Sequence, residues 1–189
     1  GLGDVYKRQT IPFANKSLAN NRDKLTSYKD ITTYNNYYEF GTSKSDPYRN
    51  SQIFKTTPWE ISIEGEVEKP IKLSMEEISE MFVSEERIYR LRCVEGWSMV
   101  IPWMGFSLSE LLSKVNPTNK AKFVEFESVY DPAQMKGQRY PVLNWPYNEG
   151  LRIDEAMHPL TTVVTGLYGK KLPNLSLIHI SEPTRPLGI

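Results

Sequence analysis

Apolar and polar residues alternate in several short stretches of the chain, which is the pattern of half-buried β-strands. In residues 59–65 every second position is apolar, and the stretch ends at a glycine. Residues 86–93 and 122–128 repeat the alternation, and residues 160–169 are rich in β-branched side chains. We therefore predict four strands separated by turns.

Two other stretches carry the signals of helices. Ser74 and Glu77 form a capping box ahead of apolar residues at helical spacing. Ser107 and Glu110 repeat this arrangement, and the leucine-rich stripe that follows ends before Pro117. Strands mixed with short helices, without regular βαβ alternation, indicate an α+β fold.

The predicted elements divide the chain into four parts. Residues 10–32 are polar without periodicity and predict an extended N-terminal arm. Residues 33–174 hold all the predicted elements and form one domain. Residues 1–9 and 175–189 resemble translated library-adapter sequence, so we expect both ends to be foreign to the protein.

The charge balance excludes some classes of partner. The 189 residues contain 23 basic and 23 acidic side chains. A net charge of zero gives no basic surplus for binding nucleic acid or a membrane surface. No apolar run reaches the roughly 18 residues of a membrane helix, and the sequence as written carries no export signal.

Cys93 is the one cysteine of the chain, which excludes an internal disulfide and an all-cysteine zinc site. Alternation places it on the face of its strand with Tyr89 and Leu91, while Arg90 and Arg92 lie on the other face. The positive field of the arginines favours thiolate. From these residues alone, Cys93 is a buried apolar residue, a nucleophile or a metal ligand.

The stretch around this cysteine, RLRCVEGWSMVIPWMG, resembles the molybdenum-ligand segment of bacterial methionine-sulfoxide reductase catalytic subunits, in the sulfite oxidase superfamily. The resemblance implies a mixed, β-rich molybdopterin-binding fold. It also implies that the Cys93 sulfur binds molybdenum directly, beside the dithiolene of one molybdopterin.

Two distant stretches resemble the same family. YNNYYEFG implies that Asn35, Tyr38 and Glu39 contact the pterin, whose many donors and acceptors suit these side chains. The alternative is an aromatic loop packed onto the core. Ser128 stands where the family usually has threonine, which keeps a hydroxyl for the cofactor. The alternative is a serine that closes a strand before a turn.

The segment GLRIDEAMHPLT also matches the family. Glu155 and His158 echo part of a zinc-protease motif, but Pro159 stops any helix there. We therefore interpret His158 as a packed or hydrogen-bonded residue near the site. The domain sequence contains no Walker loop, dinucleotide-binding glycine motif or nucleophile elbow, which disfavours nucleotide-dependent chemistry.

The resemblance implies an enzyme that reduces methionine sulfoxide in proteins by oxygen-atom transfer, with molybdenum-molybdopterin as cofactor. Its implied partners are oxidised periplasmic proteins and a membrane haem-binding subunit that donates electrons, and its implied location is the periplasm. The family domain continues beyond the matching residues 33–174, so we expect part of the pocket to be missing here. The alternatives are a sulfite-oxidising relative, a binding module without cofactor and an inert assembly product.

Overall fold

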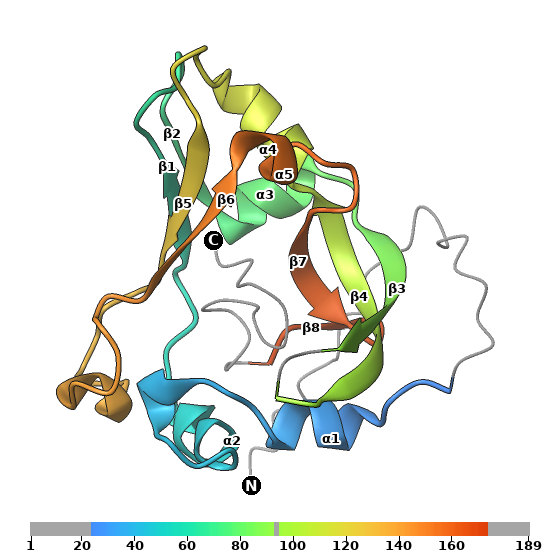
Figure 1. The fold of residues 1–189 in the computed structure, drawn as a ribbon, viewed down its shortest axis with the longest axis vertical. Helices are drawn as coiled ribbons and strands as arrows, with labels where there is room; N and C mark the ends of the chain where they lie inside the picture. The colour runs from blue at the N-terminus through green and yellow to red at the C-terminus, as the bar shows by residue number, and fades with distance from the viewer. Residues whose placement is uncertain (1–23, 93–94, 174–189) are drawn as a thin grey trace, which may run out of the picture.

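The computed structural model describes residues 24–92 and 95–173 (Figure 1). Short helices and strands alternate irregularly along them, as an α+β fold requires. In chain order the elements are α1 (Tyr28–Thr33), η1 (Tyr38–Phe40), α2 (Asp46–Asn50), η2 (Ser51–Ile53), β1 (Glu60–Ile63), β2 (Ile71–Ser74), α3 (Met75–Met81), β3 (Glu85–Arg92), β4 (Ser98–Ser107), α4 (Leu108–Val115), β5 (Phe123–Glu127), η3 (Lys136–Arg139), β6 (Asn148–Arg152), α5 (Ile153–Ala156), β7 (Thr162–Leu167) and β8 (Lys170–Lys171). The four predicted strands correspond to β1, β3, β5 and β7.

The strands form three antiparallel sheets among the described residues. The largest has the order β3-β4-β7-β8, and the others are the pairs β1-β2 and β5-β6. The hairpin of β3 and β4 is in register from Glu85 opposite Gly105 to Arg92 opposite Ser98. Cys93 is the residue that follows Arg92 in the sequence, in the connection from β3 to β4.

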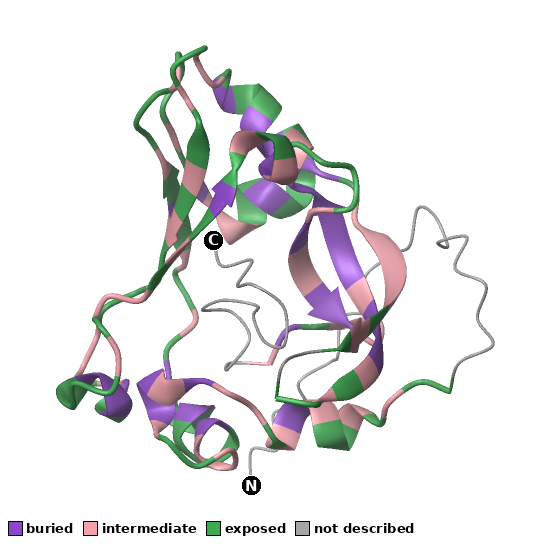
Figure 2. Cartoon of the chain, viewed as in Figure 1, coloured by how far each residue is buried: buried purple, intermediate pink, exposed green. Residues whose placement is uncertain are grey.

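The main core lies around α3 and α4. The stripe on α4 is buried as its spacing predicted, through Leu108, Leu111, Leu112 and Val115. Figure 2 shows the buried residues gathered on α4, β4 and β7, whereas β1, β2 and β5 are mostly exposed or half-buried. The buried hydrophobic stripe thus places α4 in the main core of the domain.

The two predicted capping boxes have different outcomes. At α3 the box forms: Glu77 N donates to Ser74 Oγ at 3.2 Å, and Ser74 N donates to Glu77 Oε2 at 2.7 Å. At α4, Ser107 is the N-cap residue but makes no side-chain capping bond. Its hydroxyl instead lies 2.8 Å from Ser109 Oγ, so a local side-chain partner replaces the backbone amide.

The extended arm predicted for residues 10–32 is wrong at its C-terminal end, because α1 begins at Tyr28. Ser27 caps this helix by accepting from Asp30 N at 3.1 Å. Tyr28 and Ile31 pack against a cluster formed by β4, β7 and the residues after β8. Tertiary packing thus stabilises a helix that lacks an apolar period of its own. Residues 1–23 and 174–189, including both ends expected to be foreign, lie outside the described residues.

A cavity of about 870 Å³ separates β1 from β5. Every residue from Glu60 to Val67 and from Lys120 to Glu127 lines it. Successive side chains of a strand point to opposite faces, so consecutive residues line one space only where the strand edge faces it. Among the described residues β1 pairs only with β2 and β5 only with β6, which leaves one open edge on each side of the cavity.

Candidate functional site

Asn35 holds a buried acceptor without a partner. Its amide nitrogen donates to Ile31 O at 2.8 Å, and its backbone N–H donates to Lys44 O at 2.9 Å. These two bonds fix the side chain at the end of α1. Its Oδ1 is nevertheless buried and accepts no hydrogen bond from the part of the chain that the structure describes. A buried acceptor without a donor is uncommon and points to a missing ligand.

Ser128 is another such residue. It follows β5, where Val124 and Phe126 pack against the core and Phe123 is 71% exposed, as the predicted alternation requires. Its backbone N–H donates to Tyr147 O at 2.8 Å. Its buried Oγ has no hydrogen-bond partner in residues 24–92 and 95–173. The alternative of a serine that merely closes a strand does not explain a buried hydroxyl without a partner.

Tyr38 and Glu39 lie in η1, a single turn between α1 and α2. The alternative of an aromatic loop packed on the core holds for Tyr37 and Phe40, which are buried with Phe54 and Met135. Tyr38 remains half-buried, whereas the Glu39 side chain is buried at 2% exposure. A buried carboxylate in a loop is a costly feature that binding sites commonly contain.

η3 fixes the segment after β5 next to η1. Gln138, which is 3% exposed, accepts from Asp131 N and donates to Val129 O, both at 2.8 Å. Its neighbour Gly137 packs so closely that a β-carbon there would overlap the carbonyl oxygen of Tyr38. The Ser128 segment and the η1 segment are thereby joined through two adjacent residues of η3.

Asp131 shapes the turn between Ser128 and η3. Its carboxylate accepts from Gln134 Nε2 at 2.5 Å and from the backbone N–H groups of Ala133 and Gln134. The side-chain bond from Gln134, helped by those backbone bonds, lowers the pKa of Asp131 although partial burial opposes the shift. The turn is therefore held by an ionised carboxylate at neutral pH.

The predicted metal ligand, Cys93, lies outside the described residues. The residues that follow it do contact the segment that contains Asn35 and Tyr38. Glu95 Oε2 lies 3.6 Å from Lys44 Nζ, and the rings of Trp97 and Tyr34 are 5.3 Å apart. Residues 95–97, which follow Cys93 in the sequence, and the YNNYYEFG segment are therefore neighbours in space.

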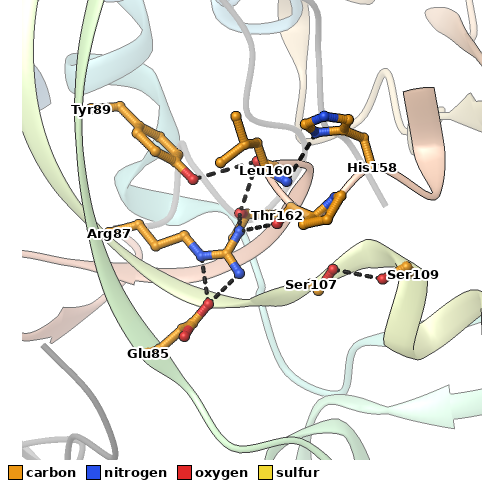
Figure 3. Close-up of polar contacts among 9 residues, drawn as sticks. Glu85, Arg87, Tyr89, Ser107, Ser109, His158, Leu160 and Thr162 are labelled. Atoms are coloured by element: carbon orange, nitrogen blue, oxygen red, sulfur yellow. Dashed lines mark hydrogen bonds and ion pairs between the residues drawn. The ribbon is translucent and has the colours of Figure 1, made fainter. Parts of the chain in front are cut away.

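A separate polar cluster lies at the other end of β3 (Figure 3). Arg87 donates through Nη1 to Pro159 O at 2.7 Å and to Thr162 Oγ1 at 2.8 Å, and through Nε to Glu85 Oε1 at 2.5 Å. Burial alone would lower the pKa of Arg87, but hydrogen bonds with Glu85 and Tyr89 outweigh it and raise the pKa. Arg87 thereby holds the loop between α5 and β7 against β3.

His158 belongs to this anchored loop. Its Nδ1 accepts from Leu160 N at 3.2 Å, which confirms that it is hydrogen-bonded. The loop contacts β3 at Arg87 and Tyr89, through the carbonyl oxygens of Pro159 and Leu160. Glu155 Oε2 accepts from Arg152 N at 2.9 Å and caps α5. Within the described residues no three His, Cys, Asp or Glu side chains form a group that could hold a metal ion.

Sequence reasoning missed Lys44 and Gln138. Lys44 lies in a polar turn, and Gln138 in a loop without periodicity, so neither carries a pattern that distinguishes it from surface residues. The one available signal was Gly137, because a glycine between polar residues marks a turn or a close backbone contact.

Comparison with known proteins gives concordant results. The profile of the oxidoreductase molybdopterin binding domain family matches residues 48–176. The protein-methionine-sulfoxide reductase catalytic subunit MsrP of Xanthomonas axonopodis pv. citri is 55% identical over 167 residues, which cover 88% of this chain and 52% of that protein. The MsrP subunit of Burkholderia mallei is 57% identical over 152 residues, covering 80% of this chain and 46% of the relative. The chain thus spans about half the length of these relatives.

A comparison with one solved structure bears on the fold and not on the function. The sulfane dehydrogenase SoxCD of Paracoccus pantotrophus superposes with a TM-score of 0.52 at 14% identity, over 78% of this chain and 36% of the SoxCD chain. The α+β, sulfite-oxidase-type fold expected from the resemblance is therefore confirmed. With 129 consecutive residues under the family profile, from 48 to 176, the chain belongs to the oxidoreductase molybdopterin binding domain family.

Proposed function

We propose that the protein containing this chain reduces methionine sulfoxide in proteins with a molybdenum-molybdopterin cofactor. The observation that carries the proposal is that two of the buried oxygens without a partner among the described residues, Asn35 Oδ1 and Ser128 Oγ, stand at positions assigned to the cofactor from sequence. The identity of 55% to a protein-methionine-sulfoxide reductase subunit supports the same activity.

The residues present fit such a group. An unsatisfied buried polar atom costs about 1–3 kcal/mol, so two of them favour any ligand that supplies hydrogen-bond donors there. Tyr38 adds a half-buried phenol and Glu39 a buried carboxylate on the adjacent turn. We propose that Asn35, Tyr38, Glu39 and Ser128 orient the pterin and that the Cys93 thiolate is the protein ligand of molybdenum.

When bound, molybdenum-molybdopterin supplies two-electron oxygen-atom transfer, the chemistry that converts a sulfoxide to a thioether. The contribution of the chain is to hold the group. Asn35 is fixed by two hydrogen bonds and Ser128 by its backbone bond to Tyr147, so their oxygens are preorganised before any ligand arrives. Cys93 follows a strand paired over eight residues, which anchors the polypeptide immediately before the ligand.

The proposal includes partners and a location. We infer from the family resemblance that the substrates are oxidised periplasmic proteins and that a membrane haem-binding subunit donates the electrons. Fractionation of cells that carry the whole gene tests the location, because a cytoplasmic protein would contradict it. Turnover that starts only when membranes with the haem subunit are added would support the proposal that this subunit donates the electrons.

The activity is tested with the chain completed by the remaining half of the Xanthomonas axonopodis relative and produced in a host that makes the cofactor. We expect stoichiometric molybdenum and reduction of peptide methionine sulfoxide, without sulfite oxidation. Cys93→Ser should abolish both, whereas Ser113→Ala, on the exposed face of α4, should change neither. Full molybdenum and full activity in Cys93→Ser would overturn the ligand assignment, and sulfite oxidation alone would favour the alternative relative.

A further inference from the structure

Lys44 contacts both segments that flank the candidate site. Its ammonium group donates a hydrogen bond to Asn36 Oδ1 and lies 3.6 Å from Glu95 Oε2. The same Nζ lies 5.3 Å from the centre of the Tyr38 ring and 5.7 Å from that of Trp97. One cation therefore joins residues 36 and 38, in the predicted pterin segment, to residues 95 and 97, which follow the predicted metal ligand.

The backbone directs Lys44 to this position. Asp46 closes the turn that holds it: Ser43 N donates to Asp46 Oδ2 at 3.0 Å, and Asp46 N donates to Ser43 O at 2.9 Å. The Lys44 carbonyl accepts from Asn35 N at 2.9 Å. A β-carbon at Gly41, where φ is +138°, would overlap the Asp46 carboxylate, so the turn depends on glycine there.

The environment of Lys44 differs from that of an ordinary surface ion pair. Its side chain is only 24% exposed, and two aromatic rings lie within the range of cation–π attraction. Lys72 offers the contrast, because it pairs with Glu60 at 2.5 Å while 61% of its side chain is exposed. Exposed pairs of that kind contribute little, whereas a partly desolvated cation with several partners is held in one place.

We propose that Lys44 is a positioning residue, which holds the segment after Cys93 against the Asn35–Tyr38 segment and so sets the separation of the cofactor's two attachment points. The effect of Lys44 on cofactor binding rests on the proposed function, because the separation of the two segments matters only when a cofactor binds between them. The contact itself is a property of the chain. It requires a cation long enough to reach both segments, a requirement that arginine meets and methionine does not.

The first experiment uses the full chain without cofactor and measures amide hydrogen exchange in peptides covering residues 95–103. We expect about threefold to tenfold faster exchange in Lys44→Met, from losing an ion pair and cation–π contacts together. Lys44→Arg should stay near the unaltered rate, and the control Lys72→Met should leave these peptides unchanged. Equal exchange in Lys44→Met and the unaltered chain would overturn the proposal.

Glu95→Gln gives a second route if Lys44→Met fails to fold. It removes the charge from the other side of the contact and should accelerate exchange in the same peptides. In the double variant the acceleration of exchange should be smaller than the sum of the two single effects, because both substitutions break the same contact. Full additivity would contradict the proposal.

The second experiment measures molybdenum retained after dialysis by the completed chain described above. We expect Lys44→Met to lose the metal about tenfold faster, the lower end of the range for residues that orient metal ligands, and Lys44→Arg to restore retention. Unchanged retention in Lys44→Met would overturn the positioning role. If no variant and no unaltered protein binds molybdenum, the proposed function fails, while hydrogen exchange still decides whether Lys44 joins the two segments.

Discussion

The α4 side of the molecule and the η1 side are built on different principles. Around α4, most buried residues are apolar, and the Phe82 and Phe106 rings stack at 4.2 Å. Around η1, the apolar cluster is small, and close by lie a buried carboxylate and buried oxygens without partners. The α4 side gains most of its stability from apolar burial, whereas the η1 side holds polar groups that a ligand can satisfy.

The largest effect that separates the two sides should come from Leu111→Ala. Leu111 is 1% exposed in the centre of the α4 cluster, so the substitution removes buried surface and leaves a cavity. We expect the free energy of unfolding to fall by about 2–5 kcal/mol. Denaturant titration measures it, and Met81→Ala, at a residue 42% exposed at the end of α3, is the control. A loss below that of the control would place the stabilising core elsewhere.

Two serine substitutions sharpen the contrast. Ser74→Ala removes a capping bond from α3 and should cost about 1 kcal/mol of stability. Ser128→Ala removes a buried hydroxyl without a partner, so the cofactor-free chain should be unchanged or more stable by up to about 1 kcal/mol. Thermal unfolding of both variants checks the difference. An equal loss in the two would show that the Ser128 hydroxyl is satisfied within the chain.

The smallest expected effect depends on pH. Because hydrogen bonding lowers the folded-state pKa of Asp131 from its ordinary 3.8, the ionised carboxylate stabilises the fold above that value. The contribution should be lost as the pH falls through the lowered pKa. Asp131→Asn should therefore weaken the decline of stability as the pH falls below about 4. Unfolding curves at several pH values test it, and parallel declines would contradict it.

The periodicity of the sequence predicted the α4 side well. The site residues on the η1 side were expected only from the family resemblance. The leucine stripe of α4 and the alternation of β1 and β5 are local consequences of helix and strand geometry. The joining of η1 to η3 depends on Gly137 and Gln138, which lie about a hundred residues away in the chain. Hydrogen bonds between loops leave no period, so they are invisible to such reasoning.

The failed predictions share one physical cause. α1 was expected to be extended because its sequence is polar, yet Tyr28 and Ile31 find apolar neighbours across the domain. Ser107 was expected to cap α4 with its side chain, yet Ser109 offers a nearer partner. A long-range contact outweighed the local preference at α1, and a competing neighbour two residues away did so at Ser107.

The two strand edges that face the cavity have a consequence for handling the protein. Among the described residues β1 and β5 each have one edge without a partner strand, and such an edge is a template on which another extended polypeptide can add. An open strand edge can pair with a strand of the same chain or with a strand of a neighbouring molecule. We therefore expect association between molecules through these edges to increase with protein concentration.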